Sequence, residues 1–221
     1  MSSIKKNQQN ILEKLKIEKI NPMQEETQLA VKSSSEVVLL SPTGTGKTLA
    51  FLLPIVANLD ENESEIQAMI IVPSRELAIQ IEQVFREMGS GFKSNAVYGG
   101  SLFSKDKANL KHRPAILVGT PGRIFDHLRR TTFSTEKITT LVLDEFDKSL
   151  EVGFESEMTQ ILSLLPNLSK KILTSATQAV QIPSFVGLKK PTYIDYLGTK
   201  KSKLEMKMVM SPEKNKLNTL F

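Results

Sequence analysis

One glycine-rich turn contains the residue types that bind phosphate, Ser41-Pro42-Thr43-Gly44-Thr45-Gly46-Lys47-Thr48. It lies between an apolar strand-like run at 37–40 and an apolar helical run at 49–53. Glycine lacks a Cβ, so backbone N–H groups can converge on anionic oxygens, and the positive N-terminus of the following helix adds to this attraction. In such a loop Lys47 reaches the β- and γ-phosphates and the Thr48 hydroxyl ligates Mg²⁺. The turn matches the phosphate-loop pattern except at Ser41, where that pattern has glycine.

An acidic cluster, Asp144-Glu145-Phe146-Asp147, follows the apolar run 140–143. Carboxylates at the end of a buried strand are costly without a cationic partner. A Mg²⁺ held by Thr48, by nucleotide phosphates and by Asp144 through water would be that partner, and Glu145 could then orient or deprotonate the attacking water. The alternative is that these acids only cap a helix, but the phosphate loop favours the metal-binding interpretation.

An α/β fold is expected to position these groups, because strand-like runs alternate with helical patterns along the chain. The strand-like runs are continuously apolar, as in a parallel sheet that is buried on both faces. In such open sheets ligands bind beyond the carboxyl ends of the strands. Strands are predicted at 36–40, 66–72, 94–98, 115–119, 140–144, 170–174 and 192–195. Helices are predicted at 7–16, 23–32, 47–58, 75–88, 102–110, 121–130, 154–165 and 179–187.

The composition excludes several kinds of site. The 221 residues include no cysteine and only two histidines, so disulfides and zinc–thiolate sites are excluded and a histidine-based catalytic site is disfavoured. No apolar run approaches the length of a membrane span, and a cytoplasmic location without membrane contact is expected. The net charge of +5 fits either a polyanionic partner or a lysine-rich solvated surface.

Further motifs follow the other predicted strands: 73–80 (Pro-Ser-Arg-Glu-Leu-Ala-Ile-Gln), Gly99-Gly100, 120–123 (Thr-Pro-Gly-Arg) and 175–177 (Ser-Ala-Thr). Alone, each could be a turn or a helix cap. Together, in order and with this spacing, they resemble the first RecA-like domain of a DEAD-box ATP-dependent RNA helicase over about residues 16–198. The resemblance implies a RecA-like P-loop NTPase fold, an open and mainly parallel sheet with helices on both faces.

The same resemblance assigns roles to individual residues. Gln24, with Ile17 and Pro22, corresponds to the motif that reads adenine, since a glutamine amide offers both a donor and an acceptor. Lys47, Asp144 and Glu145 correspond to the catalytic groups, with Mg²⁺ on Thr48 and Asp144. Residues 43–48, which are Thr43, Gly44, Thr45, Gly46, Lys47 and Thr48, would bind ATP. The positions that would contact the RNA backbone are Pro73, Arg75, Gly100, Thr120 and Arg123. Asp147, Ser175 and Thr177 would couple the nucleotide to the second domain through hydroxyl–carboxylate bonds.

Two departures from the family pattern concern packing. Phe146 stands where the family has alanine, and its ring is expected to alter the coupling to residues 175–177 while the chemistry survives. Lys16, Ile17, Ile20 and Asn21 stand where glycine, an aromatic residue, proline and threonine or serine are common. We therefore expect ATP binding with modest selectivity for the base.

The chain end suggests the organisation of domains. Residues 1–198 are expected to form the ATP-binding domain, and 199–221 a linker with the beginning of a second RecA-like domain. Residues 203–210 mostly alternate polar and apolar side chains, a pattern typical of a half-buried strand. Such an orphan strand would be disordered or would pair with a sheet edge, so a monomer is expected, with a tail-mediated dimer as the alternative.

The leading hypothesis is the ATP-binding domain of an RNA helicase, with Mg²⁺-ATP as cofactor and RNA as partner. Two rivals remain open. One is a DNA helicase or translocase with the same phosphate loop, and the other is a nucleotide-gated RNA-binding scaffold without turnover. In the leading hypothesis the second domain would be needed for robust hydrolysis, and the isolated chain would be weak or inactive as an enzyme.

Overall fold

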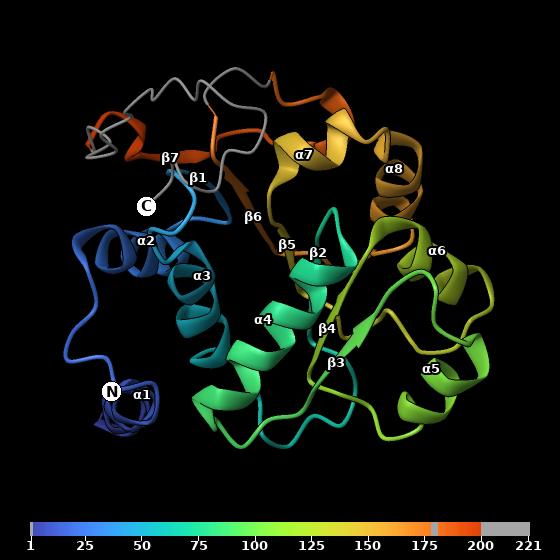
Figure 1. The fold of residues 1–221 in the computed structure, drawn as a ribbon, viewed down its shortest axis with the longest axis horizontal. Helices are drawn as coiled ribbons and strands as arrows, with labels where there is room; N and C mark the ends of the chain where they lie inside the picture. The colour runs from blue at the N-terminus through green and yellow to red at the C-terminus, as the bar shows by residue number, and fades with distance from the viewer. Residues whose placement is uncertain (1, 178–180, 200–221) are drawn as a thin grey trace, which may run out of the picture.

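A seven-stranded parallel sheet forms the centre of the molecule (Figure 1). The structure, a computed structural model, describes residues 2–177 and 181–199. The strand order is β3-β4-β2-β5-β6-β1-β7. The strands are β1 (Glu36–Leu40), β2 (Ala68–Ile71), β3 (Ser94–Val97), β4 (Ile116–Gly119), β5 (Thr140–Leu143), β6 (Lys170–Ser175) and β7 (Thr192–Asp195). The expectation of an open parallel sheet is confirmed.

Helices cover both faces of this sheet. In Figure 1, α1 to α4 lie on one side of it and α5 to α8 on the other. The first group comprises α1 (Ser2–Lys14), α2 (Pro22–Ser33), α3 (Lys47–Val56) and α4 (Arg75–Met88). The second comprises α5 (Phe103–Asn109), α6 (Pro121–Arg129), α7 (Phe146–Glu151) and α8 (Glu155–Ser163). Two 3₁₀ turns, η1 (Ser184–Val186) and η2 (Leu197–Thr199), flank β7.

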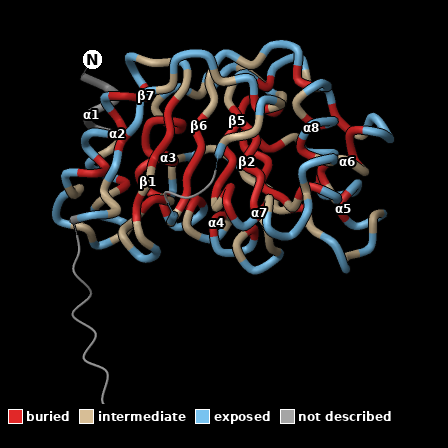
Figure 2. Tube along the Cα trace, turned by 90° about the horizontal axis from the view of Figure 1, so that it is seen from above, coloured by how far each residue is buried: buried red, intermediate tan, exposed pale blue. Residues whose placement is uncertain are grey.

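The sheet separates two apolar cores, because alternate residues of a strand point to opposite faces. Along β1, Val37 and Leu39 pack with the α1–α4 side, whereas Val38 packs with the α5–α8 side. In β2, Ile70 joins the first core, and Met69 and Ile71 join the second. Buried segments therefore run through the middle of the molecule, with exposed loops outside them (Figure 2). This explains why the strand sequences are continuously apolar.

The predicted helix at 179–187 is wrong for the part of it that the structure describes. Residues 181–187 contain only the single turn η1, after an extended Pro183. Proline has no N–H to donate and disfavours a helical residue before it, so a helix across this position is unfavourable. Gly187, with φ of 64°, then ends the turn. The short helix α7 was not predicted. The tail expectations for 200–221, including the strand and the dimer, lie outside the described residues.

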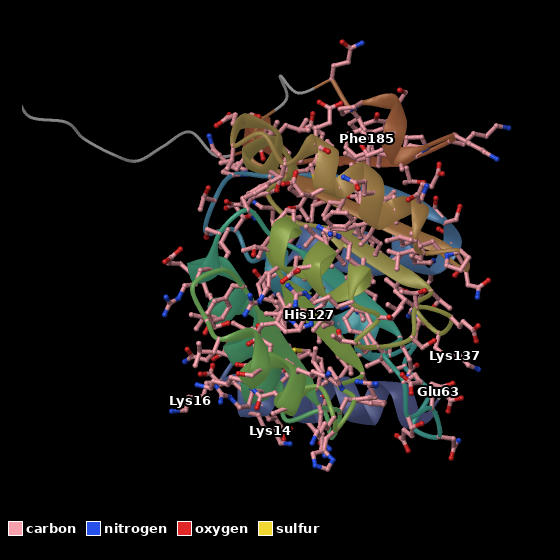
Figure 3. All side chains as sticks on the ribbon, turned by 90° about the vertical axis from the view of Figure 1, so that its right-hand side faces the viewer. Lys14, Lys16, Glu63, His127, Lys137 and Phe185 are labelled. Atoms are coloured by element: carbon pink, nitrogen blue, oxygen red, sulfur yellow. The ribbon has the colours of Figure 1, made fainter. Side chains whose placement is uncertain are left out.

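The loops at the carboxyl ends of the strands differ from the loops at their amino ends. The carboxyl ends of all seven strands lie at one edge, where the glycine-rich and acidic motifs begin. The loops at the amino ends carry surface ion pairs such as Lys137–Glu63, 3.1 Å apart (Figure 3). No helix within the described part of the chain is long and apolar enough to cross a membrane.

Candidate nucleotide and RNA site

The turn between β1 and α3 has the backbone geometry of a phosphate cradle. Gly44 and Gly46 adopt φ of 78° and 91°, which glycine tolerates without the steric penalty of a side chain. Ser41, fully buried, donates its backbone N–H to the Ser175 carbonyl at 3.0 Å. Its hydroxyl lies 2.8 Å from that of Thr45. The loop is thus tied to β6 and to itself.

Lys47 points into the turn. Its Nζ donates to the carbonyl oxygens of Ser41 at 2.6 Å and Pro42 at 3.1 Å. Burial lowers the pKa of Lys47, and the charges of Asp144, Glu145 and Asp147 oppose that shift. An ammonium group surrounded by oxygen acceptors at a helix N-terminus is suited to anionic oxygens.

The acidic cluster begins where β5 ends. Asp144 is 4% exposed, and this burial raises its pKa to about 6. The Thr174 hydroxyl, on the adjacent strand β6, donates to Asp144 Oδ1 at 2.5 Å and accepts the Glu145 N–H at 3.2 Å. Glu145 has φ of 48°, in the left-handed region, and precedes the first residue of α7. Thr174 therefore fixes the Asp144 carboxylate and the backbone at Glu145.

The donors at this edge fit Mg²⁺ bound together with phosphates. A pocket of about 300 Å³ is lined by loop residues Thr43, Gly44, Gly46, Lys47 and Thr48, by Leu77 and Gln80, and by Asp144 and Glu145. Within the described residues no cluster of three or more histidine or acidic side chains forms a metal cage. Mg²⁺ commonly binds through one or two protein oxygens with substrate phosphates and water completing its shell, and Thr48 and Asp144 can supply such oxygens.

The N-terminus of α2 is attached to the phosphate loop. Asn21 and Gln24 form a capping box, in which each side chain accepts the backbone N–H of the other residue. Asn21 Nδ2 then donates to the Thr45 carbonyl at 3.0 Å, and Gln24 Nε2 donates to the Gly46 carbonyl at 3.1 Å. Pro22 is the first residue of α2, and Ile17 packs against the core on this side of the sheet.

The contact expected between the acidic cluster and residues 175–177 is present in part. The Thr177 hydroxyl donates to Asp147 Oδ2 at 3.0 Å. The Ser175 hydroxyl instead donates to the Thr177 carbonyl at 2.8 Å, so the expectation that both hydroxyls bond Asp147 is wrong. Asp147 Oδ1 is buried without a hydrogen bond in the described structure.

The five positions predicted to contact RNA lie along the same edge. Pro73 follows β2, and Arg75 is the exposed first residue of α4. The Arg75 guanidinium lies 5.1 Å from the centre of the Tyr98 ring, and a Cβ on Gly100 would lie 3.9 Å from Arg75 Nη1. Thr120 immediately precedes α6. Of the five positions, Thr120 and Arg123 line an open groove of about 500 Å³, together with Gly99 and Gly122.

Arg123 is held more firmly than an exposed phosphate-binding arginine would be. Its Nε donates to Asp106 Oδ2 at 2.7 Å, and its Nη2 donates to the Ser101 carbonyl at 2.6 Å. The side chain is 12% exposed. Asp106 and Ser101 were not among the sequence-predicted site residues.

Comparison with known proteins identifies the family. The model of the family described as DEAD/DEAH box helicase matches residues 21–184. The chain belongs to the DEAD/DEAH box helicase family. This match contains all the strand-end motifs described above, and the RecA-like fold implied by the resemblance is confirmed.

Relatives within the family agree with this assignment. The chain is 42% identical over 167 residues to the ATP-dependent RNA helicase CshA of Limosilactobacillus reuteri, covering 75% of this chain and 34% of the relative. It is 38% identical over 209 residues to the ATP-dependent RNA helicase DRS1 of Lodderomyces elongisporus, covering 89% of this chain and 30% of the relative. The yeast DEAD-box splicing factor Prp28 has a similar structure, with a TM-score of 0.74 and 27% identity, over 83% of this chain and 46% of that one. The chain spans about a third of the length of these curated relatives.

Phe146, the departure from the DEAD-box motif, is accommodated by the second core. Its ring is 2% exposed and lies 6.5 Å from the ring of Phe185 in η1, at an interplanar angle of 52°. The ring belongs to the apolar core on the α5–α8 side. The Asp147–Thr177 bond forms beside it.

Thr174 is the site residue that sequence reasoning missed most clearly. It lies inside β6 and is fully buried, in a strand whose other buried residues are mainly apolar. A buried hydroxyl in a central strand needs a partner, so it could have been paired with the acids that end the neighbouring strand. Asn21 had a clearer signal, because Asn-x-x-Gln before an apolar run is a capping-box pattern.

Proposed function

We propose that this chain is the ATP- and RNA-binding domain of an ATP-dependent RNA helicase that works with a second RecA-like domain. The observation that carries the proposal is the convergence of three motifs at one sheet edge: the phosphate loop, the Asp144–Glu145 pair and the Asp147–Thr177 bond. The curated relatives named as ATP-dependent RNA helicases support the same activity.

In this proposal the loop binds the triphosphate of ATP. The phosphate oxygens would replace the carbonyls of Ser41 and Pro42 as acceptors for Lys47 Nζ, and the N-terminus of α3 would add its positive potential. Mg²⁺, held by Thr48 and Asp144, would supply positive charge to the phosphate oxygens. Glu145 would orient the attacking water and accept its proton.

Gln24 is the residue proposed to read adenine. Its Oε1 accepts one hydrogen bond and its Nε2 donates one, so each atom retains capacity for one further bond. One acceptor and one donor match the N6 and N7 edge of adenine. The contact of Gln24 with Gly46 would link recognition of the base to the phosphate loop.

RNA would bind across Pro73, Arg75, Gly100, Thr120 and Arg123 through its sugar–phosphate backbone. Backbone amides at helix N-termini, glycines and arginines provide contacts that carry no base information. A second domain would complete the ATP site, and its closure would couple to RNA through Asp147 and Thr177.

Nucleotide affinity tests the proposed binding of ATP and the recognition of adenine by Gln24. Isothermal titration of the 221-residue chain should show tighter binding of Mg²⁺-ATP than of Mg²⁺-GTP. K47A should weaken both by about tenfold or more, because it removes a charge-assisted bond to phosphate. Q24A should reduce the difference between the two nucleotides. Equal affinity of the wild-type chain for ATP and GTP would contradict the role given to Gln24.

The rate of ATP hydrolysis tests the proposed helicase activity. It also distinguishes a helicase from a scaffold without turnover and from a DNA translocase. In a protein that joins this chain to a second RecA-like domain, RNA should stimulate hydrolysis more than DNA does. E145Q should retain ATP binding and lose most of the turnover. A scaffold without turnover would keep its RNA-binding activity unchanged by E145Q, and a DNA translocase would respond more strongly to DNA.

A further inference from the structure

A buried charged cluster joins α5 to α6 beside the groove that we assign to RNA. At its centre is Asp106, 5% exposed, whose Oδ2 accepts the Arg123 Nε–H at 2.7 Å. The Ser101 hydroxyl lies 3.0 Å from the other carboxylate oxygen. Asp106 thus connects helix α5, helix α6 and the loop that follows Gly99-Gly100.

The cluster restrains Arg123 from several directions. Besides its bond to Asp106, the guanidinium donates through Nη2 to the Ser101 carbonyl at 2.6 Å and to the Ser101 hydroxyl at 3.1 Å. Its central carbon lies 5.3 Å from the centre of the Phe103 ring. In the described part of the chain Nη1 makes no hydrogen bond, and the side chain lines the groove together with Gly99 and Thr120.

His127 closes the inner side of the cluster. It extends from α6 and is fully buried (Figure 3). Its Nε2 lies 3.5 Å from Asp106 Oδ2, its Nδ1 lies 2.9 Å from the Thr132 hydroxyl, and its ring stacks on Phe103 with centres 4.5 Å apart. Burial lowers the pKa of His127, so Arg123 rather than an imidazolium balances the charge of Asp106.

We infer that Asp106 is a positioning residue for RNA binding: its carboxylate holds Arg123 and the loop 99–101 in the arrangement that meets an RNA phosphate. The inference rests on the proposed function. A free arginine side chain has many rotamers to lose on binding, whereas one fixed by two hydrogen-bonded partners loses few. The carboxylate itself is buried, so it acts through Arg123 and does not contact RNA.

The sign of the effect distinguishes positioning from simple electrostatics. An anion close to a polyanion-binding surface repels the ligand, so its removal alone should strengthen RNA binding. If Asp106 positions Arg123, its removal should weaken binding despite the gain in net positive charge. Asp126, on the same helix, is a matched control for charge, because it also lines the groove but its carboxylate pairs with Arg130 at 2.9 Å, whereas Arg123 bonds Asp106 and Ser101.

The experiment measures the affinity of a fluorescein-labelled 15-nucleotide oligouridylate for the full 221-residue chain by anisotropy. D106N should raise the Kd about five- to tenfold, within the range for the net contribution of one hydrogen bond, because asparagine can still accept from Arg123 but lacks the charge. D126N, which removes one negative charge beside the groove without removing a partner of Arg123, should lower the Kd. In an R123Q background D106N should add little, because the residue acts through Arg123. S101A, which leaves the carboxylate in place, should cause a smaller loss than D106N.

Two further readouts report the contacts themselves. NMR titration of His127 should give a lower pKa in D106N than in the wild type, since Asp106 raises that pKa. R123Q should reduce the dependence of log Kd on log salt by about one phosphate contact. A folded D106N with wild-type or tighter affinity would overturn the inference and leave the proposed function standing. A wild-type chain that binds no RNA, even at high concentration, would overturn both.

Discussion

Burial controls the charge of several ionisable side chains in this domain. Water stabilises an ion better than protein does, so desolvation favours the neutral form. It raises the pKa of Asp144 to about 6 and lowers the pKa values of Lys47 and His127. A bound partner of opposite charge would offset this desolvation, so binding of phosphate would stabilise the charged form of Lys47 and binding of Mg²⁺ that of Asp144.

His127 should make stability depend on pH. Its pKa is lowered from 6.5 in the folded chain, so between the two values the unfolded chain binds more protons. The free energy of unfolding then rises with pH through this window, and the contribution is lost as the pH falls below 6.5. Asp106, Arg123 and Asp126 are the charged groups that act on the ring.

Urea unfolding at pH 5 and pH 7 measures this effect. The wild-type chain should lose more stability on acidification than H127Q, which lacks the titrating group and serves as the reference for all other ionisations. Equal losses in the two proteins would show that His127 has the same pKa in both states.

Single residues were predictable where a motif specifies their surroundings and not elsewhere. The Asp147–Thr177 bond followed from the family pattern, and the structure contains it. The Ser175 hydroxyl differs, because it donates to the Thr177 carbonyl two residues on. The restraint on Arg123 could not be anticipated, since its partner Asp106 lies on another helix and has no motif of its own.

At the scale of elements, α2 and the phosphate loop act as one unit. The N-cap residue Asn21 satisfies both the first turn of α2 and the Thr45 carbonyl. Ser74 is a useful comparison, because it caps α4 through Leu77 N and no hydrogen bond connects its side chain to the loop in the described structure.

Replacing either cap by alanine should reduce the free energy of unfolding by about 1 kcal/mol, the usual contribution of an N-cap. Only N21A should also weaken Mg²⁺-ATP binding, by about threefold or more, since it releases the loop from α2. Calorimetric titration beside urea unfolding checks both effects. Comparable nucleotide affinities in N21A and S74A would show that the contact of α2 with the phosphate loop does not affect nucleotide binding.

Elements were predictable where the residue pattern is long and regular. The helix at 75–88 was predicted with the bounds that α4 has, and each predicted strand overlaps an observed one. The short helix α7 was missed, because it begins inside the acidic motif, at Phe146, and its six residues are too few to show a periodicity. In the described part of the helix predicted at 179–187 only the turn η1 forms, because Pro183 disfavours a helix across this position.

At the scale of the whole molecule, the two cores share one sheet and should unfold together. Phe146 belongs to the core on the α5–α8 side, and Phe85 of α4 belongs to the other. Both rings are almost fully buried, at 2% and 1% exposure. Replacing each phenylalanine by alanine therefore compares the same loss of side chain in the two cores.

F146A and F85A should each lower the free energy of unfolding by about 3–5 kcal/mol, the cost of losing a buried phenylalanine ring and leaving a cavity. This holds for Phe146 although alanine is the residue that the family motif carries there. Fluorescence and circular dichroism should follow one coincident transition in both variants. Separate transitions in F146A would show that the second core unfolds independently.

The strand order has a consequence for how the chain is made. β1, which leads into the phosphate loop, pairs with β6 and β7, so that Val37 lies beside Ile172 and Thr192. A ribosome adds about 5–20 residues per second, and β1 therefore waits roughly ten seconds after its own synthesis for its neighbours. During that interval its apolar residues have no strand to pair with and are available to chaperones or to other nascent chains. The nucleotide site is thus begun early in translation and completed only near the end of the described fold.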